Sequence, residues 1–363
     1  MDQFLSAQEV QARHLQLGLK ENFCVAPFTT LLLEPDGKVG ACRQKGSEFP
    51  VGNILHQNFE EIWNGAFLKT WRQEFLEGNP KICQTDIKDK QCNLCPSYNT
   101  LLEKTEFKIE QVQRPRKIAF NFNGQCNLEC TMCHIWQKEN GLYDRIGFWN
   151  QIDPWIENLE DVELLSGEPF IQKDTYRLID LLSVKRPDAK WTITTNANWK
   201  FNHFIKNKLD KVEIKNIIVS LDATNEEVYK RIRKKGDFQQ ALKTLLDLKN
   251  YETVRLSEKR SRLNIRVNFL FQKENWQDLK NNSEFCRAEG VEGFKTFLYE
   301  PFSLSLLNCP EPERIYMLEW YLDHLTSQDL ISSFRVIRPL IDSLQKVDKV
   351  YFFDRIRSRT NEV

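Results

Sequence analysis

The sequence predicts an α/β protein whose main body is a partial barrel of six βα units. Strand-like apolar runs alternate with helical ones after about residue 113, and such alternation is typical of a parallel sheet with right-handed crossovers. Six units are too few for the eight-stranded closed barrel, which leaves a partial barrel or an open sheet. A chain of 363 residues has room for about two to three domains, and we expect them at 1–112, 113–310 and 311–363.

The first of these regions is expected to hold a hairpin and two helices. Residues 23–33 are apolar and extended in pattern, and Pro35-Asp36-Gly37 is strong turn chemistry before a return strand that ends at Cys42. Apolar residues recur at helical spacing over 58–77. A shorter amphipathic helix is expected within 1–22.

The six units of the barrel follow in order. The sequence predicts strands at 117–123, 162–165, 190–195, 217–221, 264–271 and 293–299. It predicts helices at 148–159, 174–185, 201–210, 225–232, 237–250 and 276–289, and a helical extension over 311–363. Because active sites in such folds lie at the carboxyl ends of the strands, the residues that directly follow each strand are the candidates for function.

Charge and hydropathy exclude several classes of protein. Lys and Arg number 51 and Asp and Glu number 51, and this balance argues against a strongly basic nucleic-acid-binding protein. No apolar run is long enough to span a membrane, and the N-terminus lacks the apolar core of a secretion signal. We therefore expect a cytoplasmic location, with neither a membrane nor a nucleic acid as partner.

Cysteine is the unusual residue of this chain. There are ten, and eight of them lie between Cys24 and Cys133. Clustered cysteines without a secretion signal indicate metal binding or catalysis more than disulfides. The densest group follows the first barrel strand, where Cys126, Cys130 and Cys133 form a C-x3-C-x2-C motif.

Three thiolates on one short loop suit a soft metal centre. A closed zinc site and a fully ligated [4Fe–4S] cluster each need four ligands, so three thiolates would leave one iron of a cluster open for a substrate or cofactor. His134 is a possible fourth ligand of a zinc site, although its position next to Cys133 makes its reach awkward. Zinc and unliganded thiols therefore remain alternatives to a three-cysteine cluster.

This loop resembles the cluster-binding signature of the radical S-adenosylmethionine (SAM) superfamily. Members place it after the first strand of a partial TIM-like barrel, as here. Most carry an aromatic residue before the last cysteine, where this chain has Met132; methionine can still pack apolar surface against an adenine. The resemblance implies a [4Fe–4S] cluster whose open iron chelates SAM.

Further positions fit this resemblance one by one. Ser166-Gly167-Glu168-Pro169 is similar to the stretch that receives the SAM amino group, and Asn196 to an element after the third strand. Ser220 and Asp222 resemble the segment that contacts ribose and the carboxylate, and Arg233, with Arg266 as a second choice, is implied as the partner of that carboxylate. Taken alone, these residues also fit turns and a solvated helix face. The cofactor-binding residues implied are Ser166, Gly167, Glu168, Pro169, Asn196, Ser220, Asp222 and Arg233.

The upstream cysteines resemble a second module of the same superfamily. The segment from Cys24 to the C-x2-C pair of Cys92 and Cys95 is similar to the SPASM/twitch module, which carries auxiliary iron–sulfur clusters. The resemblance implies an auxiliary [4Fe–4S] cluster on Cys24, Cys42, Cys92 and Cys95, with Cys83 as a spare ligand. The better-known relatives place this module after the barrel, and a zinc ribbon remains the alternative for these cysteines.

The resemblance also implies an activity. Reductive cleavage of SAM would give a 5′-deoxyadenosyl radical that abstracts a hydrogen from a peptide or a small natural product, with electrons from a cellular donor. One alternative is a radical epimerase or dehydrogenase of a sugar-like or aminoglycoside-like substrate, with Cys309 as hydrogen donor. The other is a non-catalytic iron–sulfur or zinc protein that binds a partner. Cys286 is expected in the core.

Overall fold

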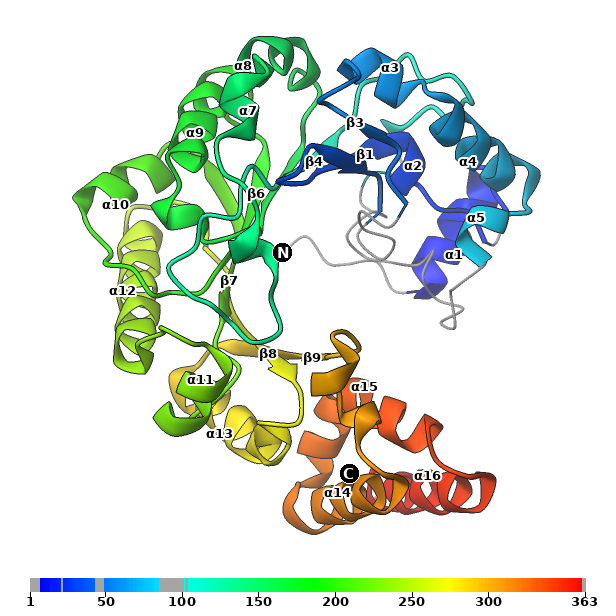
Figure 1. Cartoon of the computed structure of the whole chain (residues 1–363), viewed down its shortest axis with the longest axis vertical. Coiled ribbons are helices and arrows are strands. Elements are labelled where there is room, and N and C mark those ends of the chain that lie inside the picture. Colours follow the sequence, from blue (N-terminus) through cyan, green and yellow to red (C-terminus); the bar gives the residue numbers. More distant parts are fainter. Residues whose placement is uncertain (1–6, 21, 43–48, 85–100, 102–103, 361–363) are drawn as a thin grey trace.

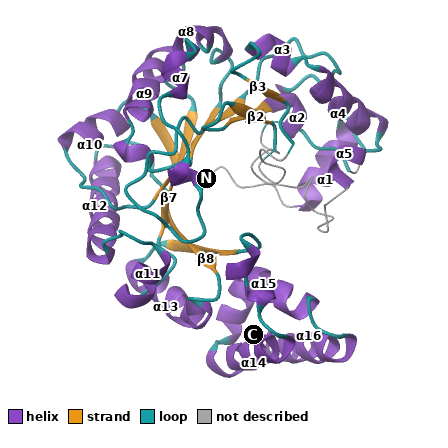
Figure 2. Ribbon diagram, viewed as in Figure 1, coloured by secondary structure: helices purple, strands orange, loops and turns teal. Residues whose placement is uncertain are grey.

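One nine-stranded sheet organises the protein in its computed structural model, which describes residues 7–20, 22–42, 49–84, 101 and 104–360. The strand order is β3-β2-β1-β4-β5-β6-β7-β8-β9. Figure 1 shows that the sheet is curved. The first described residues lie near one end of the curved sheet, and the C-terminal helices lie near the other. The curve does not close, because β3 and β9 form the two edges of the described sheet (Figure 2).

The six predicted barrel strands are all present. From β4 to β9 every neighbouring pair is parallel, so the α/β partial barrel is confirmed. The ends of the strands shift from the predicted positions by a few residues. Their bounds are β4 Lys117–Phe120, β5 Asp161–Leu164, β6 Lys190–Thr195, β7 Glu213–Ser220, β8 Ile265–Phe271 and β9 Glu292–Phe297.

Helices cross over between these strands, as the sequence predicts, with one exception. The segment predicted as a single helix over 148–159 contains only the short helix α8 (Phe148–Gln151) and a 3₁₀ turn that includes Pro154. Proline lacks the amide hydrogen that a continued helix needs. The other helices between β4 and β9 are α7 Leu142–Arg145, α9 Lys173–Lys185, α10 His203–Leu209, α11 Glu226–Ile232, α12 Phe238–Ser257 and α13 Leu279–Glu289.

The N-terminal region extends the barrel sheet. The predicted hairpin is present as β1 (Thr30–Leu33) and β2 (Lys38–Gly40), with β3 (Gly52–Asn53) beside it. Strand β1 also pairs in parallel with β4, with Leu31 opposite Ile118. The hairpin and the barrel therefore share one sheet, which the sequence did not indicate, and the domain limits at 112 and 310 stay predictions.

The helices of this region differ in detail from the predicted ones. The extended run expected over 23–33 is interrupted by the one-turn helix α2 (Ala26–Thr29), which has Pro27 in its first turn, where proline is tolerated. The helix expected over 58–77 is two helices, because Asn64 and Gly65 end the first and begin the second. The remaining bounds are α1 Ala7–Gln16, α3 Phe59–Trp63, α4 Ala66–Glu77 and α5 Lys81–Gln84.

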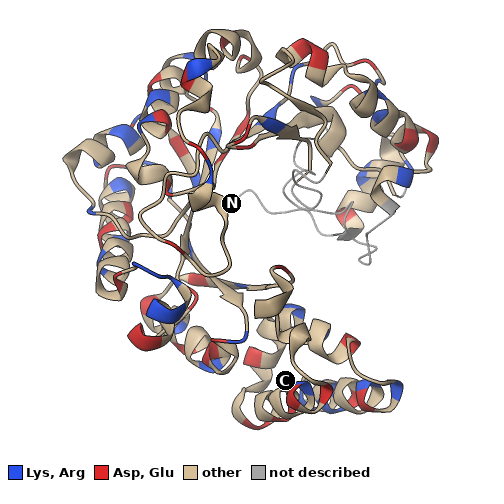
Figure 3. Ribbon diagram, viewed as in Figure 1, with Lys and Arg blue, Asp and Glu red and all other residues tan. Residues whose placement is uncertain are grey.

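The predicted C-terminal extension consists of α14 (Glu311–His324), α15 (Ser327–Asp342) and α16 (Lys346–Thr360). These helices lie beside β9 at the end of the sheet (Figure 1). Positively and negatively charged residues are interspersed along the outer helices (Figure 3), which agrees with the balanced charge of the sequence. Within the described residues, no helix combines the length and apolar character that a membrane crossing requires.

Candidate functional site

The three cysteines of the C-x3-C-x2-C motif lie on the loop that follows β4. Two backbone hydrogen bonds hold this loop against the end of α11: Glu129 N donates to Lys234 O at 3.0 Å, and Thr131 N donates to Ile232 O at 2.9 Å. The three thiols are partly exposed. The anchors Ile232 and Lys234 were missed from the sequence, because a bond between two backbone groups leaves no side-chain signal.

The loop passes close to the residues that follow β5. Glu168 N donates to Gln125 O at 2.9 Å, and Gln172 Nε2 donates to the same oxygen at 3.1 Å. Gly167 adopts a φ of 61°, and a Cβ there would come within 2.3 Å of Gln125 O. Glycine is therefore required at 167, for its positive φ and for this close approach.

Glu168 is a fully buried acid of this region. Its Oε1 accepts hydrogen bonds from Thr195 Oγ1 at 2.8 Å and from Phe170 N at 3.1 Å, and its Oε2 accepts from Asn196 N at 2.7 Å. Burial raises the pKa of Glu168 to about 7, although these donors and the charge of Arg233 oppose the rise. The carboxylate thus joins the ends of two neighbouring strands, β5 and β6.

Asn196 connects the end of β6 to the cysteine loop. Its Nδ2 donates to Asn127 Oδ1 at 3.0 Å and to Cys126 Sγ at 3.6 Å. The following residue, Ala197, has a φ of 59°, which marks a tight turn directly after the strand. This turn directs the amide side chain of Asn196 toward the thiol.

A buried ion pair completes the site beyond β7. Arg233 Nη2 lies 2.7 Å from Asp222 Oδ2, and both side chains are less than a tenth exposed. Arg233 Nη1 also donates to Cys130 Sγ at 3.9 Å. Burial raises the pKa of the Cys130 thiol to about 11, and the charge of Arg233 counteracts this effect.

The other residues singled out from the sequence are placed as follows. Ser166 Oγ donates to Asn123 O at 3.0 Å, Pro169 begins a 3₁₀ turn, and Ser220 is the last residue of β7. Arg266 lies elsewhere, since it is the second residue of β8 and its Nε is 2.8 Å from Glu292 Oε2. It is therefore at the amino edge of the sheet, away from the cysteine loop.

The cysteine loop fits an iron–sulfur cluster better than a single metal ion. Within the described ranges, no three Cys, His, Asp or Glu side chains form a set that could hold one ion. The three thiols nevertheless lie on one short loop, in which Cys133 N donates to Cys130 O at 3.1 Å. A cubane spreads its thiolates over different irons, so thiols too far apart for one ion still suit it.

The second cysteine set is only partly described. Cys24 is half-buried and precedes α2, and Cys42 is buried two residues after β2, so both lie just outside the strands of the hairpin on which they were predicted. Trp71 Nε1 donates to Cys83 Sγ at 3.1 Å. Cys92 and Cys95 lie outside the described residues, so the four-cysteine set stays a prediction.

The two remaining cysteines are buried. Cys286 lies on α13 and belongs to the hydrophobic core, as predicted. Cys309 is also part of this core, in the loop before α14, with 6% of its surface exposed.

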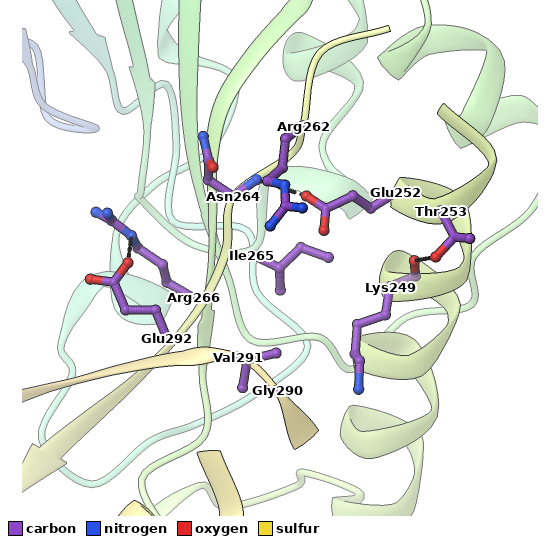
Figure 4. Close-up of a pocket in the computed structure, with 10 residues that line it drawn as sticks. All are labelled: Lys249, Glu252, Thr253, Arg262, Asn264, Ile265, Arg266, Gly290, Val291 and Glu292. Carbon is purple, nitrogen blue, oxygen red and sulfur yellow. Dashed lines mark hydrogen bonds and ion pairs between the residues drawn. The ribbon is translucent and has the colours of Figure 1, made fainter. Parts of the chain in front are cut away.

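A cavity of about 230 Å³ lies at the amino edge of the sheet. Figure 4 shows Arg266 and Glu292 joined on one side of it. Lys249 donates to Glu289, and Glu252 accepts from the backbone amides of Leu263 and Asn264. Because these charged groups already have partners and the thiols lie at the other edge, we place the functional site on the cysteine loop.

Comparisons with known families agree with this placement. The radical SAM superfamily matches residues 120–286, which include the cysteine loop, and the SPASM iron–sulfur cluster-binding domain matches residues 24–96. A radical SAM domain implies a [4Fe–4S] cluster and SAM, and a SPASM domain implies auxiliary iron–sulfur clusters.

The chain is also similar to individual proteins. A probable GTP 3′,8-cyclase of Methanocaldococcus jannaschii is 28% identical over 48% of this chain and 56% of its own length. Mycofactocin maturase MftC of Mycolicibacterium smegmatis is 27% identical over 39% of this chain and 37% of its own. The chain thus spans about half or less of the length of these relatives.

Among solved structures, SuiB of Streptococcus suis bound to S-adenosylmethionine aligns with a TM-score of 0.42 and 17% identity. The alignment covers 72% of this chain and 59% of that one. The cysteine motif, the parallel sheet and the two family matches lead to the same conclusion. The chain carries a radical SAM domain over residues 120–286, and a SPASM iron–sulfur cluster-binding domain over residues 24–96 precedes it.

Proposed function

We propose that this protein is a radical SAM enzyme that abstracts a hydrogen atom from a peptide substrate, with Cys126, Cys130 and Cys133 as the ligands of its catalytic cluster. The observation that carries the proposal is the meeting of this loop with Glu168, Asn196 and the Asp222–Arg233 pair at the carboxyl edge of the sheet. When bound, the cluster supplies the electron that cleaves SAM to methionine and a 5′-deoxyadenosyl radical.

The residues of the chain have the task of holding SAM and excluding water. Glu168 would receive the amino group of SAM, because this buried carboxylate accepts N–H and O–H donors but makes no direct ion pair among the described residues. Ser166 to Pro169, with Gly167 in its positive φ, would present backbone groups to the same cofactor. Ser220 and Asp222 end the next strand and are the candidates to face the ribose.

A peptide is the substrate class that we favour. One solved relative is described as SuiB bound to precursor peptide SuiA, and MftC is named as a maturase. GTP is the competing substrate, because five of the curated relatives are named as GTP 3′,8-cyclases or a probable one. The short aligned spans do not transfer either substrate to this chain.

Isotope transfer separates these substrates. The full chain is reconstituted anaerobically, reduced and mixed with SAM and either a library of deuterated peptides or deuterated GTP. We expect deuterium in 5′-deoxyadenosine with a peptide and none with GTP. Transfer from GTP alone would overturn the peptide assignment and leave the radical chemistry standing.

Iron counting tests the auxiliary module. If Cys24, Cys42, Cys92 and Cys95 hold a second cubane, reconstitution gives about 8 Fe per chain. About 4 Fe with one zinc would support the zinc-ribbon alternative instead. Substituting Cys24 should remove only the iron of the auxiliary cluster, because Cys24 precedes α2 and is not on the loop after β4.

The burial of Cys309 gives the epimerase alternative no support, since a hydrogen donor must meet the substrate. Cys309→Ala decides the matter. An epimerase that uses this thiol would lose turnover and keep SAM cleavage, whereas the proposed enzyme keeps both. A non-catalytic protein would form no 5′-deoxyadenosine at all when loaded and reduced.

A further inference from the structure

The cysteine thiols receive hydrogen bonds of unequal number and kind. Cys126 Sγ accepts from Leu128 N at 3.4 Å and from Asn196 Nδ2 at 3.6 Å. Cys130 Sγ accepts from the charged Arg233 at 3.9 Å. No donor to Cys133 Sγ is present among the described residues. These contacts exist without SAM, so they belong to the protein itself.

Both side-chain donors are held in place by other groups. The backbone N–H of Asn196 donates a hydrogen bond to Glu168 Oε2. The side-chain Oδ1 of Asn196 accepts a hydrogen bond from Asn198 N at 2.7 Å. Arg233 is fixed by its ion pair with the fully buried Asp222. Neither donor can turn away from its thiol without breaking one of these contacts.

Donors of this kind favour the reduced form of a cluster. Reduction adds one negative charge to the cluster and its thiolates, and N–H groups that face the sulfurs stabilise that charge. Arg233 acts at a longer distance than Asn196, but it carries a full positive charge in a buried setting, where charges interact more strongly.

We propose that Asn196 and Arg233 are positioning residues that raise the reduction potential of the cluster held by Cys126, Cys130 and Cys133. The inference rests on the proposed function, because it needs that ligand set. It differs from the role that the resemblance implies for these two residues, which is direct contact with SAM. A residue that contacts only SAM has no effect on the cluster when SAM is absent.

The test is a redox titration of the reconstituted full chain, followed by electron paramagnetic resonance without SAM. The signal of this cluster is assigned beforehand as the one that changes when SAM is added. Arg233→Lys keeps a cation for Asp222 and loses the fork that reaches Cys130, and Asn196→Leu removes the side-chain N–H donors without adding a charge. Arg231→Lys is the matched control, since Arg231 lies two residues away and pairs with Glu227 and Glu274.

We expect the ratio of reduced to oxidised cluster at a fixed potential to fall about tenfold in each variant, which is about 59 mV for one electron. The midpoint potential of the cluster should stay unchanged in the Arg231→Lys control. Unchanged midpoints in variants with full iron content, with only SAM binding weakened, would overturn the inference alone. If Arg233→Lys fails to load iron, Asn196→Leu decides by itself. A reduced wild type without any SAM-responsive signal would overturn the proposed function as well.

Discussion

The two edges of the barrel sheet carry polar residues of different kinds. At the amino edge, acids meet cations, as in Arg116 with Glu160 at 2.7 Å and Arg266 with Glu292 at 2.8 Å. At the carboxyl edge Asp222 pairs with Arg233, but Glu168 is buried without a direct ion pair among the described residues, and three thiols lie beyond it. The amino edge is already neutralised, whereas the carboxyl edge keeps the capacity to bind a cation and a metal cluster.

The largest effect is expected on iron content, when a cysteine of the carboxyl edge is removed. Cys130→Ala should lower the iron content of the reconstituted chain by about 4 Fe, because three ligands hold one cubane and two do not. Iron is measured by a colorimetric assay after desalting. Cys286→Ala is the control, because that thiol is packed in the core and should leave the iron content unchanged. Full iron content in Cys130→Ala would remove the cluster from this edge.

The pH dependence of stability is the next effect in size. Glu168 has a folded pKa of about 7 against an ordinary value of 4.5, so between these values the folded state binds more protons than the unfolded state. The free energy of unfolding of the SAM-free and cluster-free protein should therefore fall as pH rises through this window, by up to about 3 kcal/mol. Urea denaturation at several pH values measures it, and Glu168→Gln should flatten the slope. Equal slopes in both proteins would contradict the burial argument.

Glu168→Gln should also weaken SAM binding. The amide keeps the shape but loses the negative charge that would meet the amino group of SAM, which corresponds to roughly 10- to 100-fold in Kd. Equilibrium dialysis with labelled SAM measures the change. Glu160→Gln is the matched control at the amino edge, where the acid faces Arg116, and its Kd should stay at the wild-type value. A loss of the same size in both variants would argue that the two edges do not differ.

The smallest effect is expected for Arg266→Gln. Its ion pair with Glu292 is partly exposed, and such pairs contribute about 1 kcal/mol or less to stability. Thermal unfolding should shift by a few degrees at most, with iron content and SAM binding unchanged. A large loss of SAM binding would restore Arg266 as a ligand of the cofactor carboxylate.

Most of the carboxyl edge was predictable because it depends on regular repeats. Once six parallel strands are recognised, the residues after each strand must meet at one edge, and Glu168, Asn196 and Asp222 do so. Arg266 was an error of position, since it begins its strand rather than following it. The strand pairing of β1 with β4 could not be predicted, because pairing between distant segments leaves no local pattern.

The hydrogen bonds from Asn196 and Arg233 to the thiols also could not be predicted from the sequence. They depend on the turn at Ala197, with its φ of 59°, and on the end of α11. The prediction of one helix over 148–159 was wrong, because Pro154 lies within this range and proline lacks the amide hydrogen that a continued helix needs. Local irregularities therefore decide the details of a site whose general location follows from the topology.

The central claim is that the carboxyl edge performs radical SAM chemistry, and the formation of 5′-deoxyadenosine tests it most directly. The reconstituted wild type, Arg266→Gln and Cys130→Ala are reduced with dithionite, mixed with SAM and analysed by liquid chromatography with mass detection. The account predicts 5′-deoxyadenosine from the wild type and from Arg266→Gln, and only background from Cys130→Ala. Formation at the wild-type rate by Cys130→Ala, or none by the iron-loaded wild type, would contradict it.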